Sequence, residues 1–149
     1  MARISGLFSG KSYNMDSITV GVTEDPTVSR MTISFTSDDR TFEQVKKQLN
    51  RSVEVIKVVD YTDIPIHKRE VLFVMVNSCS SADKDEVFRI ANAFGYNIAD
   101  YNRNSILVEC VQTEDKNDNA IKLFKETFPN RIEVIRGGSV AVEAISIAD

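Results

Sequence analysis

The alternation of hydrophobic and polar residues predicts a pair of strands near the N-terminus. In residues 16–22 the apolar residues Ile18, Val20 and Val22 alternate with Ser17, Thr19 and Gly21, and residues 31–35 repeat this period of two. Such a period is typical of a strand with one buried face. Between the two runs, residues 23–27 contain Asp25 and Pro26, which favour a turn. The pattern therefore predicts a hairpin.

Helical spacing occurs on both sides of this hairpin. Apolar residues at helical intervals predict a short amphipathic helix over residues 3–11 and a second helix behind the capping residues 37–39. The β-branched run at residues 53–59 predicts a strand, and residues 60–65 are predicted to be a linker. The second helix is expected to bury three apolar residues at positions i, i+3 and i+7: Phe42, Val45 and Leu49.

A second run of elements begins at residue 70. Residues 70–76 are almost continuously apolar, as expected of a strand that is central in a sheet or buried on both faces. Ser80 or Ser81 can cap the following helix, and Gly95 can end it. The buried face of this helix is expected to consist of Val87, Ile90, Ala91 and Phe94.

Two strands, a helix and a last strand complete the second run. The strands are predicted at residues 96–101 and 105–111, and the last strand at residues 131–135. Pro129 ends the helix between them. Residues 139–149 are a candidate for an additional edge strand. The helix is marked by the apolar residues Ala120, Ile121, Phe124 and Phe128.

The two runs form an internal repeat. The first has the order αββαβ and the second has the order βαββαβ, which is a complete ferredoxin-like unit. Residues at equivalent places also agree: Arg3-Ile4, Phe8 and Tyr13-Asn14-Met15 correspond to Arg89-Ile90, Phe94 and Tyr96-Asn97-Ile98. The expected fold class is α+β, with two ferredoxin-like (βαββαβ) domains at residues 1–61 and 66–149. The first of them lacks its first strand.

Composition narrows the function classes. The 149 residues are 42% hydrophobic, enough for a substantial core, and 18 basic against 22 acidic residues give a net charge of -4. This charge, without a basic block, argues against nucleic acid as a partner. No apolar run reaches the roughly 18 to 20 residues of a membrane helix, and no signal-peptide layout is present. We therefore expect a cytoplasmic protein with no membrane partner.

The sequence offers little for catalysis or metal binding. Its single histidine, His67, lies in the predicted linker region, and the chain has no GxSxG elbow, P-loop or GxGxxG motif. Cys79 and Cys110 lack CxxC spacing, which favours reduced, partly buried thiols. The acidic clusters at residues 83–86 and 114–116 fit helix starts better than metal sites. We expect neither catalytic nor metal-binding residues.

Several segments together resemble one protein family, the small regulatory subunit of acetolactate (acetohydroxyacid) synthase. The similarity covers essentially the whole chain. It is carried by residues 6–9, 13–20, 25–33 and 44–49 in the first half and by residues 67–71, 84–87 and 132–137 in the second. The most specific part is the run from Tyr13-Asn14 to Ser29-Arg30-Met31-Thr32.

The resemblance implies an N-terminal ACT domain, an amino-acid sensor of ferredoxin-like fold, followed by a second ferredoxin-like domain. It implies no catalysis and no cofactor on this chain, with thiamine diphosphate, Mg and FAD expected on a large catalytic subunit. The small subunit would bind and activate that partner and confer feedback inhibition by valine or other branched-chain amino acids. It would also form a homodimer through the ACT domain.

The resemblance also implies an effector site at the start of the second ACT strand, where Asn14 and Met15 match the family. A side-chain amide offers both a donor and an acceptor, which suits a zwitterionic amino acid. An asparagine at this corner can equally cap the preceding helix or adopt a left-handed turn. At Asn97, the equivalent corner of the second half, the structural role is the favoured interpretation.

The chain departs from the family pattern at its start. Family members begin roughly fifteen residues earlier, with the first strand and an Asn- and Gly-containing loop that receives the ligand carboxylate. Two explanations stay open: a misassigned start codon, or a genuine loss of feedback. The alternative function is a free-standing ACT amino-acid sensor that regulates another partner.

Overall fold

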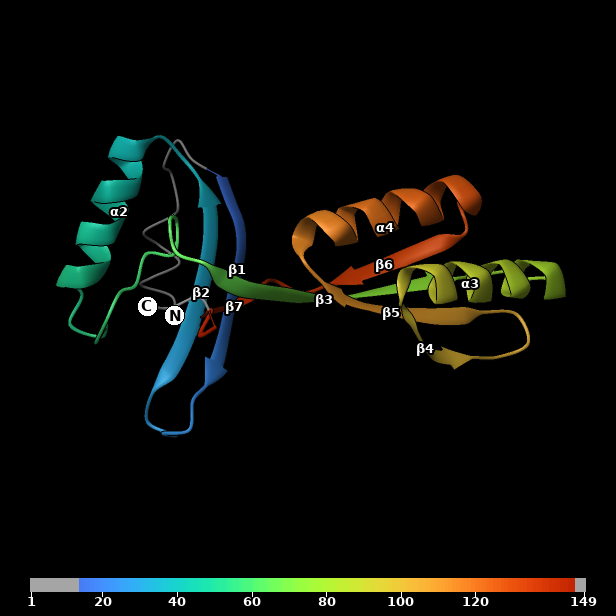
Figure 1. The fold of residues 1–149 in the computed structure, drawn as a ribbon, viewed down its shortest axis with the longest axis horizontal. Coiled ribbons are helices and arrows are strands. Elements are labelled where there is room, and N and C mark those ends of the chain that lie inside the picture. The colour runs from blue at the N-terminus through green and yellow to red at the C-terminus, as the bar shows by residue number, and fades with distance from the viewer. Residues whose placement is uncertain (1–13, 147–149) are drawn as a thin grey trace. The chain divides into compact units, whose positions relative to one another are not determined.

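The protein is a mixed α+β chain that divides into two compact units. The computed structural model describes the backbone of residues 14–146 and the side chains of residues 16–146; the helix predicted over residues 3–11 lies outside this range. Residues 68–140 form one unit, and the remaining described residues on both sides form the other. The elements (Figure 1) are β1 (Asn14–Val22), β2 (Ser29–Thr36), α2 (Asp39–Arg51), β3 (Ile66–Val76), α3 (Ser81–Phe94), β4 (Asn97–Tyr101), β5 (Ile106–Gln112), α4 (Glu114–Thr127), β6 (Ile132–Arg136) and β7 (Val140–Glu143).

The first unit contains the predicted hairpin. Strands β1 and β2 pair antiparallel, and the turn is closed by a hydrogen bond from the Thr23 N–H to the Val28 carbonyl (3.0 Å). Within the turn, the Asp25 carboxylate accepts from the Thr27 N–H (3.0 Å). The face expected to be buried is only partly covered, since Val20 and Val22 are 45% and 70% exposed.

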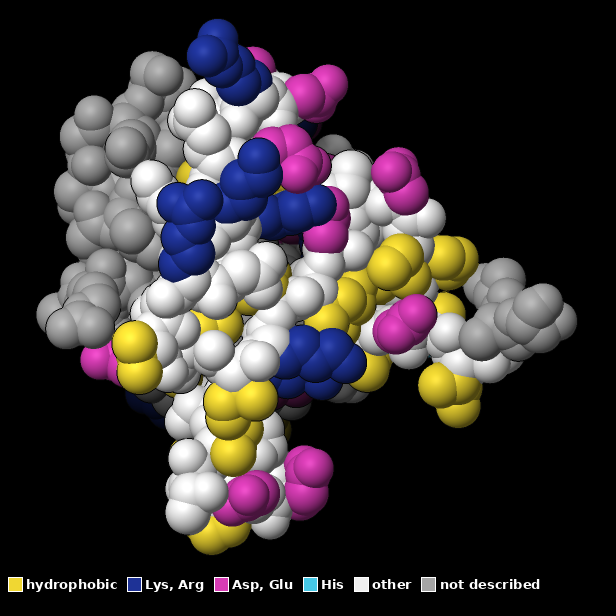
Figure 2. Space-filling model, turned by 90° about the vertical axis from the view of Figure 1, so that its left-hand side faces the viewer, with side chains coloured by type: hydrophobic (Ala, Val, Ile, Leu, Met, Phe, Trp, Pro, Cys, Tyr) yellow, Lys and Arg dark blue, Asp and Glu magenta, His cyan; other side chains and the backbone are white. Residues whose placement is uncertain are grey.

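Helix α2 follows the hairpin as the sequence predicts. Its N-cap is Asp38, whose carboxylate accepts from the Thr41 N–H at 2.7 Å. Of the three apolar residues expected on its inner face, Val45 is fully buried and the other two are half-buried. The outward face carries exposed basic residues, and Figure 2 shows Lys and Arg side chains gathered on this side. Helix α2 is therefore amphipathic, with a solvated charged face.

The strand predicted at residues 53–59 is wrong. This segment has no strand in the structure, and Val53 and Ile56 are 94% and 84% exposed. A β-branched sequence becomes a strand only where another strand offers ladder hydrogen bonds, and no strand in the described part of the chain pairs with it. The end of the segment is instead fixed by the Lys46 ammonium, which lies 3.2 Å from the Asp60 carboxylate.

The second unit is the complete βαββαβ arrangement that the sequence predicts. Its elements β3, α3, β4, β5, α4 and β6 form a sheet of order β4-β5-β3-β6, with β3 as an inner strand. Both helices lie on the same side of this sheet (Figure 1). Between helices and sheet lies a core that includes Leu72, Val74, Val76, Val87, Ile106, Val108, Phe124 and Phe128.

Helix α3 has the boundaries that the sequence predicts. Ser80 caps it through a capping box, in which its hydroxyl accepts from the Asp83 N–H (3.1 Å) and the Asp83 carboxylate accepts from the Ser80 N–H (3.0 Å). Gly95 ends it at a φ of 75°, a left-handed conformation that glycine adopts without strain. One expected core residue is not buried: Phe94 is 59% exposed and stacks on Tyr96.

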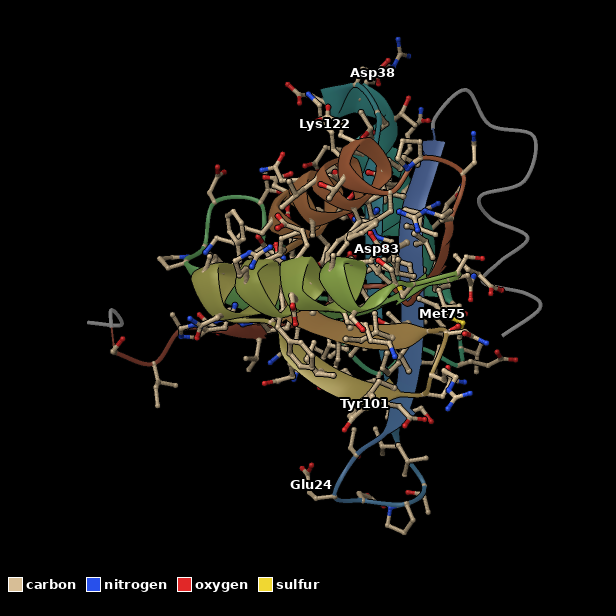
Figure 3. The ribbon with its side chains drawn as sticks, turned by 90° about the vertical axis from the view of Figure 1, so that its right-hand side faces the viewer. Glu24, Asp38, Met75, Asp83, Tyr101 and Lys122 are labelled. Atoms are coloured by element: carbon tan, nitrogen blue, oxygen red, sulfur yellow. The ribbon has the colours of Figure 1, made fainter. Side chains whose placement is uncertain are left out.

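Asp83 also forms an ion pair that ties α3 to the start of β6. The Arg131 guanidinium donates to the carboxylate of Asp83, which Figure 3 labels, at 2.9 Å and to the Ser78 carbonyl at 3.0 Å. The hydrogen bond from Arg131, followed by the one from the Ser80 N–H, lowers the pKa of Asp83 from 3.8 to about 2.

This shift predicts a pH dependence of stability. Because the folded pKa lies below the unfolded one, the contribution of Asp83 is complete above about pH 4 and is lost as the pH falls through about 2. We expect Asp83→Asn to flatten the fall of the unfolding free energy over this range, measured by urea unfolding at several pH values. Asp85→Asn, a change at an exposed acid of the same helix, should keep the wild-type slope. Equal slopes for all three proteins would contradict the prediction.

The tail adds the edge strand that the sequence suggested. Strand β7 pairs with β3, and the Ala144 N–H donates to the Pro65 carbonyl at 2.9 Å. Ala141 and Ala144 are buried, whereas Val140 and Val142 are 60% and 49% exposed. The segment after Gly137 is therefore part of the folded chain, at least to the end of the described range.

Candidate functional site

The candidate site is the corner at which β1 begins. Asn14 pairs with Thr36 and Met15 with Phe35, but the register then shifts, so that Asp16 is the extra residue of a β-bulge before Ser17. Bulges bend a strand and redirect its side chains, and they occur often beside functional sites. The start of β1 is therefore a distorted strand end rather than a regular edge.

Polar groups gather at this bulge. The Thr36 hydroxyl donates to the Asp16 carboxylate at 3.1 Å. This hydrogen bond joins β2 to the bulged residue of β1. The Ser17 hydroxyl is buried and has no hydrogen-bond partner among the described residues. A buried hydroxyl without a partner costs free energy, and such groups often have a ligand, a water or another segment as partner. Within the described part of the chain, the corner therefore has a polar group without a partner next to the predicted residues.

The backbones of the two predicted effector residues lie at this corner. Asn14 and Met15 are the first two residues of β1, immediately before the bulge. Their side chains are outside the described part of the structure, so their role in binding stays a prediction. The sequence analysis missed the bulge and Ser17, and the only signal for them was the break in alternation at Asp16.

The second unit repeats the bulge. Strand β4 starts at Asn97, and its register with β5 shifts between Ile98 and Asp100, the same distance after the asparagine as in β1. The agreement extends the internal repeat from sequence to backbone geometry. Asn97 is exposed on the edge strand of its sheet, which fits the structural role that the sequence favoured.

A buried polar cluster in the second unit was not predicted. Glu70 is 4% exposed, and its carboxylate accepts from the Arg136 Nε at 2.6 Å and from the Asn117 amide at 3.1 Å. Arg136 also pairs with Asp118 at 2.7 Å and donates to the Glu114 carbonyl at 3.1 Å. Burial alone would lower the pKa of Arg136, but the hydrogen bonds to the two acids raise it overall. Because its charges are paired internally, we interpret the cluster as structural.

The thiols of Cys79 and Cys110 are buried and are not activated as nucleophiles. Cys110 is 1% exposed, and burial raises its pKa to about 11; burial likewise raises the pKa of Cys79. Only the thiolate is a good nucleophile. We therefore expect both cysteines to resist a thiol-reactive dye in the native protein and to react fully in denaturant, measured by absorbance. Rapid labelling of the native protein would contradict this placement.

The remaining candidates for chemistry are scattered. His67 is exposed on β3. Within residues 16–146, no group of three or more His, Cys, Asp or Glu side chains could hold a metal ion. None of the described helices is long and apolar enough to cross a membrane.

The fold and the corner define an α+β protein of ferredoxin-like units, whose candidate site is a bulged strand start. Two family models match the chain. One, described as an ACT domain like that of the AHAS small subunit, matches residues 1–57, and one described as the small subunit of acetolactate synthase matches residues 69–145. The chain belongs to the family of acetolactate synthase small subunits, which are regulatory and not catalytic. This confirms the resemblance and the predicted fold class.

Relatives agree over nearly the whole chain. The acetolactate synthase small subunit of Aquifex aeolicus is 40% identical over 143 residues, 95% of this chain and 73% of the relative. That of Haemophilus influenzae is 37% identical over 142 residues, 95% of this chain and 86% of the relative. The crystal structure of the Thermotoga maritima small subunit matches with a TM-score of 0.82 and 32% identity, over 97% of this chain and 88% of that one.

Proposed function

We propose that this chain binds the large catalytic subunit of acetolactate synthase, raises its activity and makes it sensitive to valine or another branched-chain amino acid. The catalytic subunit would carry the thiamine diphosphate, Mg and FAD, and both would act in the cytoplasm in isoleucine, leucine and valine biosynthesis. The observation that carries the proposal is that both halves of the chain match small-subunit families. An allosteric role also needs no catalytic group on this chain.

The effector site in this proposal is the bulged corner of β1, in a homodimer formed through the first unit. A zwitterionic amino acid needs partners for an ammonium and for a carboxylate, and the Asn14 amide can supply a donor and an acceptor. The Ser17 hydroxyl, which has no hydrogen-bond partner among the described residues, supports a polar ligand at this place. The Asp16 carboxylate, two residues from Asn14, adds a negative charge on the same strand end.

The test is the valine response of the reconstituted enzyme. Acetolactate formation by the catalytic subunit should fall on addition of valine when this chain is present and should stay unchanged when the chain is absent. A valine response that does not depend on this chain would contradict feedback control through it.

Within that assay, Asn14→Ala should shift the half-inhibitory valine concentration upward by about ten-fold, because loss of a hydrogen bond to the bound ligand would cost about 1 to 2 kcal/mol. Activation without valine should be unchanged. Asn97→Ala, the same change at the equivalent corner of the second unit, is the matched control. The enzyme reconstituted with it should have the half-inhibitory valine concentration of the wild type. Unchanged valine sensitivity of Asn14→Ala would count against the assigned corner.

A further inference from the structure

The C-terminal end of helix α2 carries basic side chains that are not paired with acids. Lys47 and Arg51 are exposed and lie one helical turn apart, and Lys57 is exposed in the segment that follows the helix. None of the three forms an ion pair with a residue of the described chain, whereas Lys46 pairs with two carboxylates at 3.2 Å. Like charges one turn apart on a helix repel each other. A carboxylate from another molecule would therefore be favoured at this place.

Two aliphatic side chains next to these cations are almost completely exposed. Val53 is 94% exposed and Ile56 is 84% exposed. A turn closed by a hydrogen bond from the Val55 N–H to the Ser52 carbonyl (3.1 Å) keeps both residues directly after the end of α2. Burial of such side chains favours association. We call this surface the α2 end patch, which consists of Lys47, Arg51, Val53, Ile56 and Lys57.

The α2 end patch is locally basic in a chain of net charge -4. Glu54 is the only acid in residues 44–59, and it stands against the three unpaired cations and Lys46. Protein interfaces typically combine an apolar centre, in which Arg is enriched, with a polar rim. The patch has this composition, and its charge calls for an acidic partner surface.

The charge also argues against other occupants. In a two-fold dimer the same patch of both copies would meet, so the cations of one copy would lie against those of the other. Such a like-charge arrangement costs several kcal/mol. Nucleic acid fits poorly, because Glu54 and the acidic remainder of the chain would repel phosphates. An acidic protein surface with some apolar residues satisfies both the cations and the two aliphatic side chains.

We infer that the α2 end patch docks onto an acidic, partly apolar surface of the catalytic subunit. This inference rests on the proposed function, because it takes the catalytic subunit as the partner. It assigns the first unit a direct part in forming the holoenzyme, through residues other than those of the corner at the start of β1.

The test titrates the catalytic subunit with variants of the full chain and records acetolactate formation. Lys47→Glu reverses a charge and should raise the half-saturating concentration at least ten-fold at low salt, with a smaller effect at high salt. Ile56→Ser keeps the net charge and should raise that concentration about ten-fold at both salt concentrations, because an aliphatic side chain is no longer buried on docking. An effect of Lys47→Glu that does not depend on salt would contradict the pairing of charges.

Each variant has a matched control. Lys122→Glu makes the same charge reversal at an exposed lysine of α4, and Ile145→Ser makes the same apolar change at an isoleucine that is 88% exposed. Both controls should titrate as wild type does. Thermal unfolding checks that all four variants are folded, and Ile56→Ser tests the patch without a change inside the helix.

The outcomes separate the inference from the function on which it rests. If wild type activates and both folded patch variants titrate identically to it, the docking patch is wrong and the regulatory function stands. If light scattering shows that the patch variants lose self-association while activation is unchanged, the patch joins copies of this chain, and the inference is overturned. If wild type neither binds nor activates, the proposed function fails and the inference falls with it.

Discussion

Arg136→Met is expected to lower the free energy of unfolding by about 3 to 5 kcal/mol, since breaking a buried ion pair leaves an uncompensated charge. The charge left behind is that of Glu70, whose side chain is 3% exposed and loses its 2.6 Å hydrogen bond from Arg136. A domain of this size has a total stability of about 5 to 15 kcal/mol. The change should therefore remove a large fraction of this stability.

Two further variants separate the buried charge from the loss of packing. Asp118, the other acid bound to Arg136, is 56% exposed, so Asp118→Ala should cost less than about 1 kcal/mol. The double variant Glu70→Leu with Arg136→Met removes both charges and should recover much of the loss. Urea unfolding at neutral pH measures all three. A loss of under about 1 kcal/mol for Arg136→Met alone would show that the pair contributes little.

Phe124→Ala is the second large effect that we expect, at about 3 to 5 kcal/mol, because it empties a fully buried aromatic position. The Phe124 ring lies between Tyr96 and Phe128, with centroid distances of 6.3 Å and 6.4 Å. Phe94→Ala is a matched control, since Phe94 also contacts Tyr96 but is 59% exposed. It should cost far less in the same urea titration. Equal losses would mean that the core is not centred on Phe124.

Elements defined by local chemistry could be predicted from the sequence. The turn around Asp25, the N-cap at Ser80 and the helix end at Gly95 depend on hydrogen bonds and dihedral angles within a few residues. The order of the second unit also followed from its sequence pattern. In all these places the local preference and the fold agree.

Elements that depend on distant partners could not be predicted as well. Residues 53–59 have strand composition but no strand, because a ladder needs a neighbour that the described part of the first unit does not provide. Strand β3 is central, as expected, yet it is covered on one face only. Because its sequence is almost continuously apolar, the sequence did not distinguish the residues that face the helices from those that point away from them.

The candidate site shows the same difference between features set by nearby residues and features set by distant ones. Family resemblance led to the corner at Asn14 and Met15, but the bulge at Asp16 appears only when β1 is paired with β2. The pairing of Glu70 with Arg136 links residues 66 positions apart in sequence. In hindsight, the alternation of β3 places Glu70 in phase with Leu72, Val74 and Val76, which was a signal for a buried acid that needs a cation.

The most direct test of the regulatory role is the rate of acetolactate formation by the catalytic subunit, measured without valine while this chain is added. We predict a saturable rise in rate that reaches a plateau at a fixed ratio of the two subunits, with the two chains eluting together in size-exclusion chromatography. A rate that stays at the level of the catalytic subunit alone, with separate elution, would contradict the account.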